Sequence, residues 1–189
     1  GGWTCCPYEA INEAEIFDLT NQSWSATATK VTTANYAPIV LNTGKVLVAG
    51  GDNGIQPSNV DVATAELFDP FTGTWTATGN MTIDRNNHSL SQLQNGQVLA
   101  AGGHHGGWGW GYDLNSSELF DPSSGTWSLT GSMNSVRSGH IAMTLSNGQI
   151  LAVGGYWLSS AELYTPPCIS GSTICADTDG DSYGDASNS

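Results

Sequence analysis

The sequence predicts an all-β protein built from repeated four-stranded antiparallel sheets, with strands for about three such sheets. An acidic and aromatic segment occurs four times, at residues 14–18, 65–70, 117–122 and 161–164. Tryptophans that follow the first three copies are 51 and 52 residues apart: Trp24, Trp75 and Trp127. A glycine pair recurs every 52 residues, at 50–51, 102–103 and 154–155. A fixed period of this size indicates stacked copies of one small unit that cannot bury its faces alone.

The first two strands of each repeat are predicted around a turn signal. Short apolar runs stop at the glycine pairs, at residues 46–49, 98–101 and 150–153. Each run follows Asn-Thr-Gly (42–44) or Asn-Gly (95–96 and 147–148). Asn-Gly permits positive φ at both central positions of a tight hairpin turn. We therefore expect antiparallel pairing with preceding strands at 37–41, 88–93 and 140–145.

The third and fourth strands come from the acidic-aromatic segment and the tryptophan segment. Glu-Leu-Phe-Asp alternates polar and apolar residues, as a half-buried strand does. Asp-Pro followed by Thr-Gly or Ser-Gly then turns the chain into the tryptophan strand. No segment keeps a 3.6-residue period over three turns, so no helix is expected.

Such sheets, repeating about every 50 residues, are typical of β-propeller blades. Over residues 1–166 the repeats resemble the kelch family in four features: the double glycine, the Glu-Leu-Phe-Asp-Pro segment, the spaced tryptophan, and Arg-x-x-His ten residues after the tryptophan. The last pattern comprises Arg85 with His88 and Arg137 with His140, whereas Ala34 and Ala37 stand in the first copy.

The resemblance to kelch proteins implies structural roles for the repeated side chains. The aromatic residues expected in the core are Phe17, Phe68, Phe120, Tyr164 and the three spaced tryptophans. The Arg and His residues are expected to make hydrogen bonds between blades. A closed propeller has roughly four to eight blades, so we expect a propeller segment that is incomplete or is completed by another chain.

Three explanations for the missing strands remain open. The chain is a fragment of a longer propeller, or a neighbouring chain supplies the strands, or it is one subunit of a polymer. An open sheet edge is a template for strand pairing. Head-to-tail joining that does not close produces filaments.

Residues 167–189 form a separate Cys-containing acidic tail or linker in this interpretation. Asp177, Asp179, Asp181 and Asp185 stand at positions 1, 3, 5 and 9 of a loop-like run, and Tyr183 at position 7 offers a backbone carbonyl. Calcium prefers about six to eight oxygen ligands, which this alternation can supply. The run resembles the calcium loops of thrombospondin type 3 repeats and EF-hands, although Ser182 and Asn188 depart from the EF-hand pattern. We expect a structural calcium site of modest affinity; an unstructured acidic linker is the alternative.

The cysteines lie near the two ends of the chain, at Cys5, Cys6, Cys168 and Cys175. An even count without a CxxC pair favours disulfides formed in an oxidising compartment, with zinc binding as the alternative. Together with a resemblance of the tail to repeats in secreted bacterial proteins, this predicts a secreted or cell-surface bacterial protein. Four Asn-x-Ser/Thr sequons permit glycosylation, at Asn21, Asn80, Asn87 and Asn115.

Charge excludes some partners. The chain has 4 Lys and Arg against 17 Asp and Glu, and a formal net charge of −13. Nucleic acids and anionic membrane surfaces would be repelled, and no apolar run approaches the length of a membrane helix. The charge suits contact with cations or with neutral polymers such as glycans, and it also simply favours solubility.

One segment departs from the repeat: the loop that contains His104, His105, Trp108 and Trp110. Its histidines and aromatic rings could hold a metal or stack on sugar rings, or pack against the propeller end or an assembly interface. Galactose-oxidase-like enzymes also carry kelch blades, but no Cys, Tyr and His constellation here matches their copper site. We therefore expect a non-catalytic extracellular protein for structural assembly, possible as a filament subunit, or for surface binding. A glycan- or protein-binding module is the first alternative, and part of an oxidase is the second.

Overall fold

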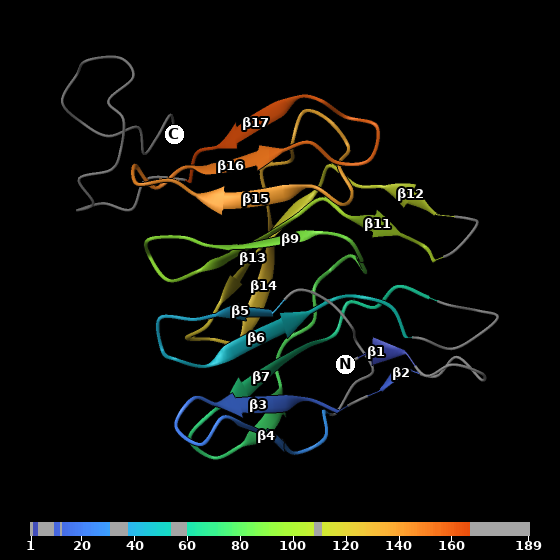
Figure 1. Ribbon diagram of the computed structural model, residues 1–189. Helices are drawn as coiled ribbons and strands as arrows, with labels where there is room; N and C mark the ends of the chain where they lie inside the picture. Colours follow the sequence, from blue (N-terminus) through green and yellow to red (C-terminus); the bar gives the residue numbers. More distant parts are fainter. Residues whose placement is uncertain are drawn as a thin grey trace.

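The computed structural model describes residues 2–3, 10–11, 13–30, 38–53, 60–107 and 111–166, where the chain forms strands and turns without a helix. Its sheets follow one another along a stack, from β3–β4 through two larger sheets to β15–β17 (Figure 1). This arrangement confirms the predicted all-β class. Within the described residues no helix is long and apolar enough to cross a membrane.

Two sheets have the four antiparallel strands predicted for a complete blade. The first, blade B, contains β5 (Pro38–Val40), β6 (Val46–Ala49), β7 (Ala65–Asp69) and β8 (Thr74–Ala77) in that order. The second, blade C, contains β9 (Ser89–Gln92), β10 (Val98–Ala101), β13 (Ser117–Asp121) and β14 (Thr126–Thr130). Strand β9 contacts both β5 and the later β15, so the first strands of successive sheets lie side by side.

The sheets at the two ends of the stack have fewer strands among the described residues. Half-blade A pairs β3 (Glu15–Asp18) with β4 (Ser23–Ala26), which correspond to the third and fourth strands of a blade. Sheet D contains β15 (Ile141–Thr144), β16 (Ile150–Val153) and β17 (Ala161–Tyr164), which correspond to the first three. The strands of these four sheets therefore number 13, one more than three four-stranded blades require.

Two short hairpins project at the glycine-pair end of the sheets. They are β1 (Gly2–Trp3) with β2 (Ala10–Ile11), and β11 (His104–His105) with β12 (Tyr112–Asp113). Both lie on the right side of Figure 1. The second hairpin is the segment that the sequence singles out as a departure from the repeat.

The turns between the first two strands differ from the expected type. Gly96 and Gly148 have positive φ, but Asn95 and Asn147 do not. Gly96 donates to the carbonyl of Leu93, and Leu93 donates to Gln97, which describes a type I turn followed by a glycine bulge. The prediction of positive φ at both central positions was wrong, because the Asn side chain instead accepts a bond from the amide two residues later.

The core lies between blades rather than inside one. One face of blade B, with Leu47 and Ala49, packs on the opposite face of blade C, with Val98, Ala100 and Phe120. The next interface repeats this arrangement. The residues there are Leu93, Leu99, Ala101 and Leu119 of blade C and Ile150, Ala142 and Tyr164 of sheet D. Blade C, which has a neighbour on each side, thus buries both faces.

The predicted aromatic core is confirmed in the complete blades and wrong in half-blade A. Phe68 and Phe120 are buried, and Trp75 and Trp127 pack on them with ring centroids 5.0 Å apart. Phe17 and Trp24 form the same ring pair, at 5.1 Å, but are 41% and 64% exposed. Blade B covers the equivalent pair, Phe120 and Trp127, whereas among the described residues no sheet lies on the corresponding face of half-blade A.

Candidate functional site

The Arg residues of the repeated Arg-x-x-His pattern each hold one blade together from inside. Arg85 is fully buried and donates from Nη1 to the carbonyls of Gly102 (2.8 Å) and Ser116 (3.0 Å). Its Nη2 lies 2.9 Å from Oε1 of Glu118, which is also fully buried. Because Gly102 ends β10 and Glu118 lies in β13, this side chain fixes the chain entering blade C against two of its strands.

Arg137 repeats the arrangement in sheet D. Its Nε lies 2.9 Å from Oε1 of Glu162, and Nη1 donates to the carbonyls of Gly154 (2.7 Å) and Ser160 (2.9 Å). Partial burial would raise the pKa of Glu162, but bonds from the Asn134 amide, Arg137 and the Ser135 amide hold that pKa below its usual value. The Glu162 carboxylate is therefore ionised, and its hydrogen bonds hold the loop that contains residues 134–137.

The histidines of the pattern lie between blades. His140 Nε2 is 2.9 Å from the Ser89 hydroxyl in blade C. Burial, then the charges of Arg85 and His140, lower the pKa of His88 to about 3, and burial, then Arg137, lowers that of His140. Both imidazoles are neutral near pH 7 and unsuited to proton transfer there. The expected hydrogen bond between blades is confirmed for His140. The same prediction was wrong for Arg85 and Arg137, because each binds carbonyls and a glutamate within a single sheet.

Blade B uses a different cation where the first copy lacks Arg. Glu66 is buried at the position of Glu118, and its charge acts on the buried Lys30. Burial lowers the pKa of Lys30, and Glu66 opposes that shift. A lysine from the preceding loop therefore supplies positive charge near Glu66 although the repeat position holds Ala34.

A second polar cluster gathers at the glycine-pair end, around the β11–β12 hairpin. Nδ1 of His104 lies 3.1 Å from Oδ1 of Asp113, and Nδ1 of His105 lies 2.6 Å from Oδ1 of Asp84. The His105 ring also packs on Tyr112, with centroids 5.0 Å apart. Asp84 and His105 are about one-third exposed and Tyr112 is exposed, so this group presents an aromatic ring beside an imidazole and a carboxylate to solvent.

A buried carboxylate anchors this cluster to blade B. Asp61 accepts hydrogen bonds from the Asn86 side chain and from the Gly107 amide (3.1 Å). Burial raises the pKa of Asp61, and these two bonds lower it in part. Asp61 in this way ties a loop of blade B to two segments of the next blade: the chain that enters blade C at Asn86, and the loop after β11 at Gly107.

The aromatic surface at the same end includes Tyr156 and Trp157. Trp157 is fully exposed and has a φ of 65°, a left-handed conformation that is unusual for a bulky residue. Tyr156 covers Gly139, where a Cβ would meet the Tyr156 ring at 2.9 Å. Gly139 in turn donates to the Asn87 carbonyl (2.9 Å), so this surface extends from blade C to sheet D.

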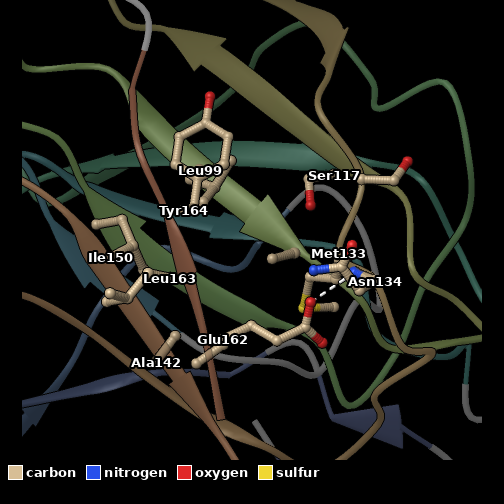
Figure 2. A pocket seen from close by; sticks show the side chains of 12 residues that line it. Leu99, Ser117, Met133, Asn134, Ala142, Ile150, Glu162, Leu163 and Tyr164 are labelled. Carbon is tan, nitrogen blue, oxygen red and sulfur yellow. Dashed lines mark hydrogen bonds between the residues drawn. The ribbon is translucent and has the colours of Figure 1, made fainter. Parts of the chain in front are cut away.

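A cavity of about 60 Å³ lies between blade C and sheet D, and Figure 2 shows the side chains that line it. Leu99, Ile150, Leu163 and Tyr164 line it on one side, and Glu162 reaches toward Asn134 on the other. Its volume accommodates roughly one or two waters. It is a packing defect beside Glu162 and too small for a sugar or a peptide side chain.

The sequence-predicted sites are only partly described by the structure. His104 and His105 lie in the hairpin, in separate pairs with Asp113 and Asp84, whereas Trp108 and Trp110 fall outside the described residues. The predicted disulfide residues Cys5, Cys6, Cys168 and Cys175 also fall outside, as does the predicted calcium loop with Asp177, Asp179, Asp181, Tyr183 and Asp185. In the described part of the chain, no three His, Cys, Asp or Glu side chains gather closely enough for a metal ion.

The four sequon asparagines are all described. Asn21, Asn80 and Asn115 are exposed, while Asn87 is half-buried in a left-handed conformation and donates to Asn86 Oδ1 (2.7 Å). Asn115 donates to the Met133 carbonyl (3.1 Å). The candidate glycosylation sites with accessible side chains are therefore Asn21, Asn80 and Asn115, and they stay predictions.

Sequence reasoning missed Asp61 and Asp84. Asp61 and Asp113 stand 52 residues apart, so the period itself marks them as equivalent loop positions. Asp84 is the opposite case, because Val136 occupies the equivalent position of the next repeat. Aligning the copies residue by residue would have identified both the shared and the unique acidic residue.

Comparison with known proteins agrees with this architecture. The kelch motif family matches residues 35–82, which include all of blade B, and residues 91–134, which begin within β9 and include the rest of blade C. These two segments of the chain are kelch motifs. An F-box/kelch-repeat protein of Arabidopsis thaliana is 30% identical over 117 residues, covering 62% of this chain and 30% of that protein.

Two enzymes are among the more distant matches of the chain. Galactose oxidase of Gibberella zeae is 23% identical over 180 residues, covering 85% of this chain and 25% of the enzyme. The structure of a fungal alcohol oxidase of the AA5 family, in complex with copper, matches with a TM-score of 0.67 at 16% identity, covering 84% of this chain and 37% of that one. This last likeness shows the propeller fold alone. The chain spans about a quarter to a third of the length of these curated relatives.

Proposed function

We propose that this kelch-repeat chain is a non-catalytic module for structural assembly and surface binding outside the cell, which acts by completing its blades with neighbouring blades. The supporting observation is how the ionisable side chains of the repeat are used. Arg85, Glu118, Arg137 and Glu162 are tied up in hydrogen bonds that hold loops to strands. The surface that is left for contacts with a partner is an apolar face of a sheet.

That surface is the outer face of sheet D. Ile141, Met143 and Leu163 are exposed there, while the equivalent Ser89, Ser91 and Leu119 of blade C are buried under sheet D. Side chains that are interior in one copy of a repeat are solvent-facing in another. A contiguous apolar face of this kind marks an interaction surface.

The assembly proposal is tested by sedimentation velocity of the 189-residue chain over a range of concentrations, with and without a calcium chelator. Species larger than the 19.7 kDa monomer are expected. Loss of these species on chelation would support calcium binding by the Asp177–Asp185 run. A chain that stays monomeric at all concentrations would contradict the assembly role.

A ligand-binding role at the glycine-pair end is the second candidate. Exposed Tyr112 beside His105 and Asp84 combines a stacking surface with hydrogen-bonding groups, as sugar-binding sites do. Titration with neutral oligosaccharides, comparing the wild type with Tyr112→Ala and with Leu129→Ala as the control, tests it. Binding that survives Tyr112→Ala unchanged would contradict this site.

The oxidase alternative receives little support from the described residues. A copper site of the kind that the distant relatives imply needs histidines and tyrosines that converge. His88 and His140 lie in the blade interfaces, and His104 and His105 face Asp113 and Asp84. These residues do not fit such a site, so we derive no step through copper.

A further inference from the structure

Strands β3 and β17 are two copies of the same strand. Ala14-Glu15-Ile16-Phe17 in half-blade A and Ala161-Glu162-Leu163-Tyr164 in sheet D both occupy the third position of a blade. Sheet D contains β15, β16 and this third strand, but no tryptophan strand among the described residues. Half-blade A contains a third strand with its tryptophan strand, but no first or second strand there.

From this duplication we infer that two copies of the chain assemble by exchange: the β3–β4 hairpin of one copy replaces β17 beside β16 of the other. The result is a complete four-stranded sheet, β15–β16–β3–β4, at each junction. This inference rests on the assembly role proposed above, and it names the segment that completes the blade.

The register of the repeat shows how β3 would fit. Third strands pair with second strands identically in all three sheets, as Val46↔Phe68, Val98↔Phe120 and Ile150↔Tyr164. The same register places Phe17 opposite Ile150, and Glu15 opposite Ala152. The hairpin already has the geometry of a complete blade, because Phe17 pairs with Trp24 as Phe120 pairs with Trp127.

The exchange would also keep a carboxylate beside Arg137. Glu162 binds Arg137 Nε (2.9 Å) and the Ser135 amide (3.1 Å), and also accepts from the Asn134 amide (2.5 Å). Glu15 is the equivalent residue of β3 and is exposed in half-blade A. After the exchange, Glu15 would take over these three bonds, so Arg137 would not be left without a carboxylate.

The exchange therefore keeps the strand pairing and the glutamate bonds of β17, loses the hydrogen bond between the Tyr164 hydroxyl and Thr130 (2.9 Å), and adds burial that β17 cannot provide. Phe17, Ile16 and Trp24 are exposed in half-blade A, and in the completed sheet they would occupy the positions of Phe120, Leu119 and Trp127. Each copy would then contribute three blades, and a closed pair would contain six, within the roughly four to eight of known propellers. Exchange of equivalent elements is a low-cost route to dimers.

The two equivalent glutamates provide a test with opposite expected outcomes. Glu15→Gln weakens the incoming strand and should lower the dimer affinity at least about tenfold, because bonds to a charged group are lost. Glu162→Gln weakens the competing β17 and should increase the dimer fraction. Asp18→Asn removes the same charge from an exposed position at the other end of β3, keeps the acceptor for the Thr20 amide (2.7 Å), and should change nothing. The readout is light scattering on size-separated chain, where the dimer has twice the 19.7 kDa mass.

Hydrogen exchange on the separated dimer reports the exchange of strands directly. Amides of 161–164 should lose protection and amides of 15–17 should gain it, while 150–153 stay protected. A dimer in which 161–164 remain protected, or in which the two Gln variants shift the dimer fraction in the same direction, would overturn this inference and leave the assembly role standing. A strict monomer would overturn both, and would favour further kelch blades of a longer polypeptide as what covers sheet D.

Discussion

Blade C and sheet D have the same motif and different surroundings. Leu119 in blade C is 8% exposed, and its equivalent Leu163 in sheet D is 55% exposed. Backbone register and glycine pair are nevertheless the same in both, and each has an Arg–Glu bond, from Nη2 of Arg85 and from Nε of Arg137. The motif therefore determines how one sheet folds, whereas burial depends on whether another sheet covers it. Each prediction below compares a position in a complete blade with its counterpart in an incomplete one.

The largest difference is expected for the Arg residues. Arg85→Met leaves Glu118 as a buried charge without its guanidinium partner, which costs about 3–5 kcal/mol of stability. Arg137→Met should cost less, because Glu162 is 13% exposed whereas Glu118 is fully buried, and each glutamate retains two backbone amide bonds. Urea unfolding of both variants, measured on dilute protein, checks the difference. Equal losses of stability in the two variants would contradict the idea that burial of the glutamate sets the cost.

Truncation of the repeated aromatic residue gives the next contrast. Phe120→Ala removes a fully buried ring from the interface of blades B and C and should cost about 3–5 kcal/mol. Phe17→Ala removes a ring that is 41% exposed in the monomer and should cost about 1 kcal/mol or less under dilute conditions. Thermal unfolding followed by circular dichroism compares them. If Phe17→Ala is as damaging as Phe120→Ala, then half-blade A is covered by something else in solution.

Glycine substitutions separate backbone strain from crowding. Gly102 and Gly154 have φ values of 61° and 70°, so alanine adds strain of about 1–2 kcal/mol at either position. At Gly102 the added Cβ would also clash with the Arg137 carbonyl, whereas at Gly154 the nearest atom is 3.7 Å away. Gly102→Ala should therefore be clearly more destabilising than Gly154→Ala in the same urea assay. Equal effects would mean that the loop at Arg137 moves freely.

The pH dependence of stability tests the buried histidine. The pKa of His88 is lowered to about 3 in the folded protein, against about 6.5 for an ordinary histidine. Between these values the unfolded chain binds the extra proton, so stability is retained above pH 6.5 and falls by up to about 1.4 kcal/mol per pH unit below it. His88→Gln should reduce this slope. An unchanged slope would assign it to other groups, such as His140 and Glu162, whose lowered pKa values act in the same direction.

Relief of strain at Trp157 is the smallest expected effect. Trp157→Gly places a residue without Cβ at a φ of 65° and removes a side chain that is fully exposed. We expect a change between zero and about 1 kcal/mol of stabilisation. The melting temperature, compared with that of Trp157→Ala, is sufficient to measure it. Destabilisation by Trp157→Gly would show that the indole makes a contact in solution.

Periodicity was enough to predict the blade, its four strands and their pairing, because the signals for turn, strand and glycine pair recur together. It could not predict the exposure of Phe17 and Trp24, since a motif carries no information about what covers it. The predicted turn type was wrong because the Asn side chain of Asn-Gly accepts a hydrogen bond from the backbone amide two residues later. The pairs His105–Asp84 and Asp61–Asn86 join separate loops, and no spacing along the chain reveals them.

The glycine pair also separates the parts of the repeat that can vary from those that cannot. Counting from the start of the second strand, the paired aromatic residue comes 22 positions later at Phe68 and Phe120, but 14 positions later at Tyr164. Eight residues are absent from the last loop, and the pairing register is unchanged. Loops grafted after Gly51, Gly103 or Gly155 should therefore alter the exposed end of the protein without disturbing its sheets, which makes this chain a natural display scaffold.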